Sequence, residues 1–287
     1  MQETLQVRKL TLTDFDMVSQ MKTSVEDDYV LHIYENLVTE EHHGLYGLFE
    51  GSNLLSIAGY SIFPGGYAML GRLRSDTRIL AKGNATAILR GIMNELERDP
   101  SIKWIGANTN LNNLGARRVL AKLGLEETTT LHSVVIQDTS RIKVTPGPIW
   151  TKVEDNQSKR DLLFSLKENA LHVYPYECYY PFPLSEGLID EENLEQTVVY
   201  QNPEHSRFVM IKKDRKGDWY AQIKYFWNDH YEQSGFWETV FHHLEQEPND
   251  IGLWLDFSEI GYERIPDKSA FEEADPWVLY GQWTEKR

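Results

Sequence analysis

Apolar and polar positions divide the first part of the chain into short predicted elements. A strand is predicted over Leu5 to Leu10, followed by a helix that contains Phe15, Val18 and Met21, with Thr13 and Asp16 as its capping pair. A second helix is predicted near Val30 to Thr39. Three strand-like runs come next, separated by turn residues rich in glycine: Leu45 to Phe49, Leu54 to Phe63 and Tyr67 to Arg74. This order predicts an antiparallel meander that leads to residues 73–89.

The stretch from Leu73 to Leu89 predicts the end of a strand, a short basic turn and a helix that begins within the turn. Gly83 and Ala85 are small enough to let backbone amides approach a ligand closely. Amides at the positive end of a helix dipole favour an anion. The helix has one apolar face, which consists of Ile88, Leu89, Ile92, Met93 and Leu96.

The charge around this turn points to the same kind of ligand. Five cations accompany it, with only Asp76 in opposition: Arg72, Arg74, Arg78, Lys82 and Arg90. The protein as a whole has a formal net charge of -15 and a sequence pI near 5.1, which argues against general nucleic-acid binding. The basic turn therefore predicts a small anionic ligand, and the alternative is a solvated basic edge.

A second segment has the pattern of another strand and helix. Trp104 to Asn108 predicts a buried strand, and Gly124 suits the left-handed residue that ends a helix. A strand over Leu131 to Gln137 then completes a mixed sheet. One face of the helix is shared by Ala116, Val119, Leu120 and Leu123.

These segments resemble the GNAT acyl-CoA N-acyltransferases over about residues 1–138. The family's loop pattern, Gln/Arg-x-x-Gly-x-Gly/Ala after a strand, fits in two registers. In one register Leu80 to Ala85 fill the pattern, so Gly83 and Ala85 match; in the other, Arg78 and Gly83 match and Ala81 replaces a glycine. The family's later motif, Asn-x-x-Ala followed by Lys-Leu-Gly-Phe, is similar to Asn113, Ala116, Lys122, Leu123, Gly124 and Leu125.

The resemblance implies an α/β (α+β) fold, a mixed, mostly antiparallel sheet flanked by helices that opens in a V between its two central strands. It also implies that acetyl-CoA binds there as co-substrate, without a metal, and that an amine attacks it directly in a ternary complex. The backbone of the strand end would pair with the pantetheine arm, and amides of the turn would hold the pyrophosphate. The implied cofactor-binding residues are Leu73, Arg74, Ser75, Arg78, Ala81, Lys82, Gly83, Asn84, Ala85, Thr86 and Asn113.

The general acid of the family is missing from its usual position. Many members have a tyrosine seven residues after the asparagine of the later motif, where this chain has Leu120. Leucine cannot donate a proton to the leaving thiolate, so this role is not carried over. Tyr60 and Tyr67 on the central strands are replacement candidates, although half-buried strand aromatics are the commoner interpretation of each.

Candidates for a general base precede the second predicted strand. His42 and His43 could titrate near neutrality, and Glu40 and Glu41 are carboxylate alternatives. A loop histidine is more often simply exposed. His242 and His243 are adjacent on a predicted helix and face different directions, so they do not predict a zinc site.

Length and composition predict two domains, and the absence of a signal-peptide core and of a membrane span predicts a cytoplasmic protein. The chain has 287 residues, 41% of them hydrophobic, and we expect a cofactor-binding domain over 1–140, a linker over 141–150 and a second domain over 151–287. Its N-terminus lacks the apolar core of a signal peptide, and no apolar run approaches a membrane span. Cys178, the one cysteine, is more often buried packing than a nucleophile.

The second half of the chain repeats the element order of the first half. Paired strands over Phe208 to Lys212 and Trp219 to Trp227 precede an amphipathic helix, and later strands are predicted over Leu253 to Phe257 and Trp277 to Trp283. The basic turn is not repeated. This half is therefore either a degenerate GNAT-like domain or an unrelated α+β domain. The aromatic stretch Tyr174 to Pro183 is either a wall of a substrate pocket or an ordered connector.

The sequence thus predicts an N-acetyltransferase that acts on the primary amine of a small molecule. The acidic surface leaves room for a cationic acceptor. Two alternatives remain open: a non-catalytic CoA-binding sensor or interaction module, suggested by Leu120 and the imperfect loop, and a protein N-acetyltransferase. Oligomeric state and acceptor identity are not predicted.

Overall fold

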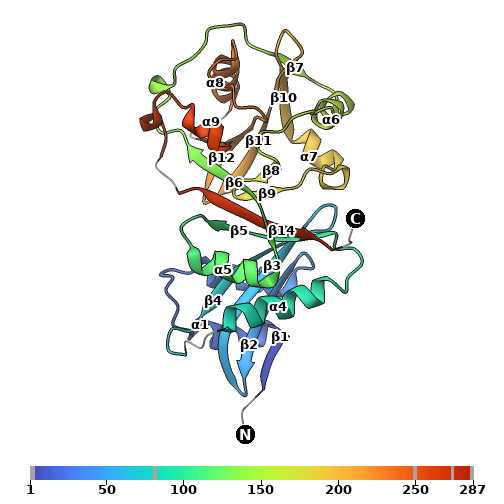
Figure 1. Ribbon diagram of the computed structural model, residues 1–287, viewed down its shortest axis with the longest axis vertical. Coiled ribbons are helices and arrows are strands. Elements are labelled where there is room, and N and C mark those ends of the chain that lie inside the picture. The colour runs from blue at the N-terminus through green and yellow to red at the C-terminus, as the bar shows by residue number, and fades with distance from the viewer. Residues whose placement is uncertain (1–3, 80–82, 248–250, 273–274, 285–287) are drawn as a thin grey trace. The chain divides into compact units, whose positions relative to one another are not determined.

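The computed structural model describes residues 4–79, 83–247, 251–272 and 275–284. The chain divides into two compact units (Figure 1). The first unit contains Met1–Thr109, Asn113–Glu127 and Tyr280–Arg287, and the second contains Asn110–Asn112 and Thr128–Leu279. These limits differ from the ranges 1–140, 141–150 and 151–287 expected from the sequence, because the chain passes between the units within three strands, β5, β6 and β14.

The first unit is built on a mostly antiparallel sheet. Its strands are β1 (Leu5–Lys9), β2 (His43–Glu50), β3 (Asn53–Phe63), β4 (Tyr67–Ser75) and β5 (Trp104–Asn110). Neighbours from β1 to β4 are antiparallel, and β4 and β5 are parallel. Gly51, Gly65 and Gly66 adopt positive φ angles in the two tight turns, which glycine tolerates best. The predicted meander is confirmed.

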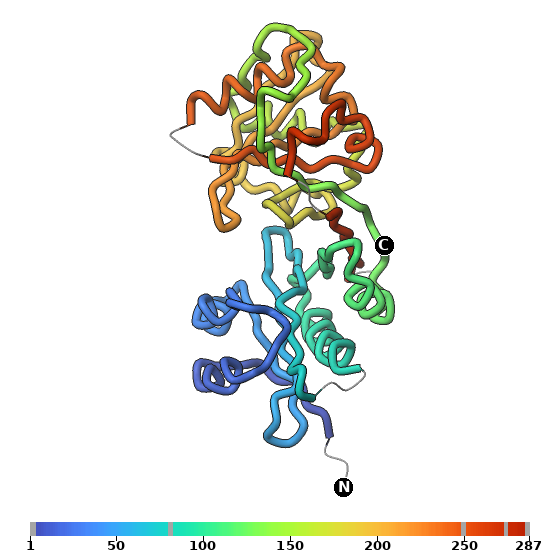
Figure 2. Tube along the Cα trace, turned by 90° about the vertical axis from the view of Figure 1, so that its left-hand side faces the viewer, coloured from blue at the N-terminus to red at the C-terminus, as the bar shows by residue number. Residues whose placement is uncertain are grey.

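Helices cover both faces of this sheet. Figure 2 shows the helices of residues 15–39 on one face, and α4 and α5 on the opposite face. The capping pair of the first turn is Thr11 with Asp14 and not Thr13 with Asp16, because a 3-10 turn precedes α1. The predicted helix at 30–39 is two short helices. The helices are α1 (Phe15–Ser19), α2 (Tyr29–His32), α3 (Tyr34–Thr39), α4 (Asn84–Leu96) and α5 (Leu114–Leu123).

The second unit has a sheet of the same kind. Its order is β6-β13-β12-β11-β10-β7, in which only β12 and β13 run parallel. Its elements are β6 (Glu126–Val135), β7 (Thr151–Val153), α6 (Asn156–Phe164), β8 (Tyr174–Glu177), β9 (Tyr180–Phe182), α7 (Glu191–Glu195), β10 (Thr197–Gln201), β11 (Phe208–Lys216), β12 (Asp218–Lys224), α8 (Phe236–Gln246), β13 (Gly252–Phe257) and α9 (Glu259–Glu263). The last strand, β14 (Trp277–Trp283), belongs to this unit up to Leu279 and to the first unit from Tyr280.

The two units repeat one arrangement. In each, a run of antiparallel strands leads into a parallel pair joined through a helix, β4-α4-β5 in the first unit and β12-α8-β13 in the second. Gly83 and Gly235 cap these two helices with φ angles of 108° and 76°. The second strand of each parallel pair has a further neighbour from elsewhere in the chain: the end of β14 lies beside β5, and β6 lies antiparallel beside β13. This repeat favours the degenerate GNAT-like half over an unrelated domain.

Candidate functional site

A cavity of about 210 Å³ opens where β4 and β5 separate. The parallel register of the two strands runs from Tyr67 opposite Trp104 to Leu70 opposite Ala107. The cavity begins at this point and is enclosed by side chains of α4 and α5. Its lining residues are Leu70, Gly71, Arg72, Leu73, Leu89, Ala107, Asn108, Thr109, Asn113, Ala116, Val119 and Leu120. The V-shaped opening implied by the family resemblance is therefore present.

A β-bulge shapes the edge of this cavity. Gly71 pairs with Gly59 and Arg74 pairs with Ile57, so Arg72 and Leu73 lie opposite the single residue between them. Arg72 has a φ of 58°, which is uncommon outside glycine. A bulge bends the strand and redirects a side chain. This bend turns β4 away from β5 beyond Leu70.

The start of α4 has no side-chain cap among the described residues. Gly83 is its N-cap, no side chain caps the helix, and the first helical bond runs from Ala87 N to Gly83 O. A Cβ added at Gly83 would meet no atom of the described residues within 4 Å. Asn84 is 5% exposed, and its Nδ2 has no hydrogen-bond partner within the described ranges. The described residues therefore leave the amides of Asn84, Ala85 and Thr86 without an acceptor, as the first amides of an uncapped helix are. Two predicted cofactor residues, Ala81 and Lys82, lie outside the described residues.

The arginines near this turn have protein partners. Arg74 binds Asp28 through Nε at 2.6 Å and Nη2 at 2.9 Å. Arg78 binds Asp76 and the Gln20 carbonyl, and the hydrogen bond from Arg78 is the main cause that lowers the pKa of Asp76 to about 2. Arg90 donates to the carbonyls of residues 122 and 123. The expectation that only Asp76 opposes these cations is wrong, because Asp28 is brought to Arg74 from 46 residues away.

Two residues of the later motif, Asn113 and Ala116, line the cavity, together with Leu120. Asn113 caps α5, and its Oδ1 accepts from Ala116 N at 3.0 Å. Leu120 is buried in the cavity wall, at the position where the resemblance has its tyrosine. Ser75 lies at the end of β4, where its hydroxyl is 2.9 Å from that of Ser56.

The proposed catalytic candidates lie elsewhere. Tyr67 is buried against Trp104 and Trp283, and Tyr60 packs on Tyr46 with its pKa raised by burial. Glu41 and His42 are exposed in the turn before β2. These positions support the structural interpretation of Tyr60 and Tyr67.

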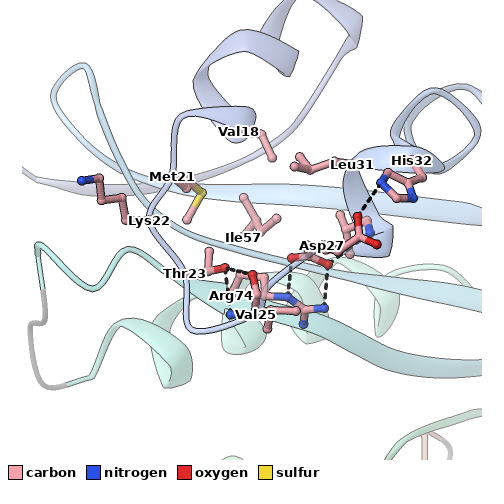
Figure 3. A pocket seen from close by; sticks show the side chains of 12 residues that line it. Val18, Met21, Lys22, Thr23, Val25, Asp27, Leu31, His32, Ile57 and Arg74 are labelled. Carbon is pink, nitrogen blue, oxygen red and sulfur yellow. Dashed lines mark hydrogen bonds and ion pairs between the residues drawn. The ribbon is translucent and has the colours of Figure 1, made fainter.

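Sequence analysis missed a second cavity of about 380 Å³ on the face covered by residues 15–39 (Figure 3). Leu73 lines the first cavity and Arg74 lines the second, so adjacent residues of β4 border both. Six of the residues that line the second cavity are apolar and six are polar or charged. Its lining residues are Val18, Met21, Lys22, Thr23, Val25, Asp27, Asp28, Val30, Leu31, His32, Ile57 and Arg74.

Four of the six polar side chains that line the second cavity form two pairs, Arg74 with Asp28 and His32 with Asp27 (Figure 3). Asp28 is neutralised by Arg74, and its pKa is lowered although burial alone would raise it. Asp27 is 3.1 Å from His32, and its carboxylate is 86% exposed. Asp27 also has a φ of 48°, an unusual backbone conformation for a residue other than glycine. Its carboxylate is the more accessible of the two for a cationic ligand.

The corresponding helix start in the second unit is covered by the chain itself. Gly235 N donates to Thr145 O at 3.0 Å, and Ser234 Oγ donates to Pro146 O at 2.7 Å. A Cβ at Gly235 would lie 2.1 Å from Pro148 O, whereas no atom of the described residues would lie within 4 Å of a Cβ at Gly83. The segment 145–148 thus occupies the place that an anion would take at α8.

Neither a metal site nor a membrane-spanning helix is found in the described ranges. No group of three or more histidine, cysteine, aspartate or glutamate side chains there is arranged to hold a metal ion. Within the same residues, every helix is too short or too polar to cross a bilayer. Cys178 is buried, and burial is the main cause that raises the pKa of its thiol.

Solved structures share the fold of this chain over nearly its whole length. A proposed acetyltransferase from Thermoplasma acidophilum is 11% identical, with a TM-score of 0.59 over 97% of this chain and 99% of that one. A GCN5-related N-acetyltransferase from Sphaerobacter thermophilus is 9% identical, with a TM-score of 0.56 over 98% and 96% of the two chains. A proposed acetyltransferase from Pyrococcus horikoshii is 11% identical, with a TM-score of 0.51 over 98% and 90%.

No family model and no curated protein matches the sequence. At identities near 10% the structural likeness establishes the fold alone. That fold extends beyond residues 1–138, to which the sequence resemblance was confined.

Proposed function

We propose, from the GNAT fold that the chain adopts over nearly its whole length, that the protein is an acetyl-CoA-dependent N-acetyltransferase. The observation that carries the proposal is the cavity between β4 and β5 in the same unit as the open helix start at Gly83. A pantetheine arm needs a strand edge and a pyrophosphate needs helix amides, and both are provided here. The buried Nδ2 of Asn84, without a partner in the described ranges, fits an acceptor atom of such a ligand.

The acceptor is proposed to be the primary amine of a small molecule. The cavity of about 380 Å³ on the opposite side of β4 is of a size for a small ligand. Its apolar walls suit a hydrocarbon body, and Asp27 suits an ammonium group. The alternative of a protein N-acetyltransferase needs a groove for an extended peptide, which this compact cavity does not favour.

The reaction is acyl transfer in a ternary complex. The amine nitrogen attacks the thioester carbonyl, a C–N bond forms, and the C–S bond breaks to release the CoA thiolate. The protein's part is to orient the two reactants, to donate to the developing oxyanion and to remove the amine proton. Leu120 supplies no acid, which a thiolate leaving group tolerates.

Binding and turnover test this proposal together. Isothermal titration with acetyl-CoA should show micromolar binding, and thiol release should follow when primary amines are added. Gly83→Asp should bind acetyl-CoA about five- to tenfold more weakly than Gly83→Asn, because only the aspartate adds negative charge at the helix start. Both variants carry the same backbone strain, so equal affinities would remove the cofactor site from this helix.

Binding without turnover would favour the alternative of a CoA-binding sensor. Leu120 in the cavity wall is the specific observation behind that alternative. The two functions are separated by thiol release in the presence of amines.

A further inference from the structure

We propose that His43 receives the proton of the attacking amine through Ser61, and that Glu40 holds the resulting imidazolium and passes the proton to solvent. The role rests on the proposed acetyl transfer. It concerns a chain of side chains, Arg72, Ser61, His43 and Glu40, that the sequence did not connect.

The hydrogen bonds of this chain are continuous. Arg72 Nη2 donates to Ser61 Oγ at 2.9 Å, and Ser61 Oγ is 2.9 Å from His43 Nδ1. His43 Nε2 lies 3.5 Å from a carboxylate oxygen of Glu40. Because Ser61 Oγ accepts from Arg72, its own hydrogen is available for Nδ1 of a neutral imidazole. Nε2 then carries a hydrogen that faces Glu40.

These side chains lie on the face of the sheet that holds the second cavity. Tyr46 reaches Glu95 of α4, and Tyr60 fills the space beside Gly44, so residues 44, 46 and 60 face α4. Side chains alternate along a strand, which places His43 and Ser61 on the opposite face. Ile57, on that face, lines the second cavity. The hydroxyl of Ser61 is therefore on the side from which the acceptor amine is proposed to approach.

Arg72 connects this chain to the proposed cofactor cavity. It lines the cavity between β4 and β5, yet its guanidinium reaches Ser61 because the bulge redirects the side chain. Its Nε is buried and has no hydrogen-bond partner within the described parts of the chain. A buried donor of this kind is costly unless a ligand satisfies it. An oxygen of the bound thioester is a suitable acceptor.

The side chains become more exposed to solvent from Ser61 through His43 to Glu40, which is the direction in which the proton leaves. Ser61 is 6% exposed, whereas the side chains of His43 and Glu40 are 26% and 51% exposed. The amine gives its proton to Ser61 Oγ while the serine hydrogen moves to His43 Nδ1, so Ser61 ends neutral and one proton is transferred.

Burial is the main cause that lowers the pKa of His43. Arg72 and His42 lower this pKa further, and Glu40 raises it. The ring is therefore neutral at pH 7 and can accept the proton.

The sequence offers a matched control beside each of the two titrating residues, His42 for His43 and Glu41 for Glu40. His43→Gln should lower kcat for acetyl transfer at least about 100-fold and remove the acidic limb of the pH profile, because the proton acceptor is lost. His42→Gln should retain the wild-type kcat, since His42 is exposed in the turn, and should keep an acidic limb that lies at slightly higher pH, because His42 lowers the pKa of His43. Glu40→Gln should shift the acidic limb to lower pH, and Glu41→Gln should leave it in place. The assay is thiol release from acetyl-CoA with the twenty amino acids, tyramine and putrescine as acceptors.

The outcomes separate this role from the proposed function. Suppose that the wild type turns over and that His43→Gln and His42→Gln have the same kcat and pH profile. This result would overturn the proton transfer through His43 and leave the proposed acetyltransferase function intact. Absence of acetyl-CoA binding would overturn the proposed function and this role with it.

If the wild type binds acetyl-CoA but turns over none of these amines, imidazole ¹⁵N spectra decide. Acetyl-CoA should change the titration of His43 through Arg72 and leave that of His42 unchanged. Equal responses would overturn the proposal. Unfolding midpoints of the variants show whether a loss arises from misfolding.

Discussion

Lys224 places a primary amine inside the second unit. Its side chain is fully buried at the end of β12, where Nζ donates to Tyr176 O at 2.8 Å and lies 3.4 Å from the Tyr174 hydroxyl. The ammonium form faces the Tyr174 ring at 4.5 Å. Desolvation is the main cause that lowers the pKa of this amine to about 7. The nearby charges of Lys212, Asp214 and Glu177 modify it less.

Lys224 predicts an unusual pH dependence of stability. Between pH 7 and 9 the unfolded chain keeps the lysine proton and the native protein does not, so the free energy of unfolding rises with pH. The contribution is at most about 1.4 kcal/mol per pH unit. Lys224→Met should remove this rise, as measured by urea unfolding at pH 7 and pH 9. Lys213→Met, on the surface of β11, should keep it; equal slopes for the two variants would contradict the assignment.

At the level of elements, α5 combines structural and proposed binding roles in one residue. Asn113 caps this helix through Ala116 N and also lines the cavity between β4 and β5. Asn113→Ala should cost about 1 kcal/mol of stability, because the cap is lost. Asn113→Asp should keep the cap and the stability but weaken acetyl-CoA binding, since it adds negative charge to the cavity. Urea unfolding and isothermal titration measure the two effects; wild-type affinity in Asn113→Asp would mean that Asn113 is a cap alone.

Elements with a local signal were predictable from the sequence. The apolar faces of α4 and α5 are buried as their spacing requires, and Gly124 ends α5 with a φ of 88°. The meander followed from glycine-rich turns between alternating strands. The α4 helix start at Gly83 was identified from the same local chemistry.

Contacts between residues that are far apart in the sequence were not predictable. Asp28 neutralises Arg74 across 46 residues, and Arg72 reaches Ser61 only because a bulge turns it. The first cap was misplaced because a 3-10 turn shifts the helix start, which helical spacing alone does not reveal. The strand beside β5 comes from the end of the chain, and no local pattern indicates that pairing.

At the level of the whole molecule, the first unit depends on a distant part of the chain. Tyr280–Arg287 belong to the first unit, although all of 128–279 belongs to the second. Within the first unit, a Cβ at Gly281 would lie 2.0 Å from the Trp104 ring, and Trp283 contacts Tyr67. The first unit therefore has an incomplete core without the last strand.

This dependence predicts that a fragment of residues 1–127 does not fold stably alone. Without Trp283 and the backbone of Tyr280, the buried rings of Tyr67 and Trp104 become exposed to water, and the apolar burial that stabilises them is lost. A peptide of residues 275–287 added in trans should restore near-ultraviolet circular dichroism and cooperative urea unfolding. The same peptide with Gly281→Val should fail, because its side chain would occupy the space of Trp104. If fragment 1–127 unfolds cooperatively at the same urea concentration with and without the peptide, the last strand is not part of the first unit's core.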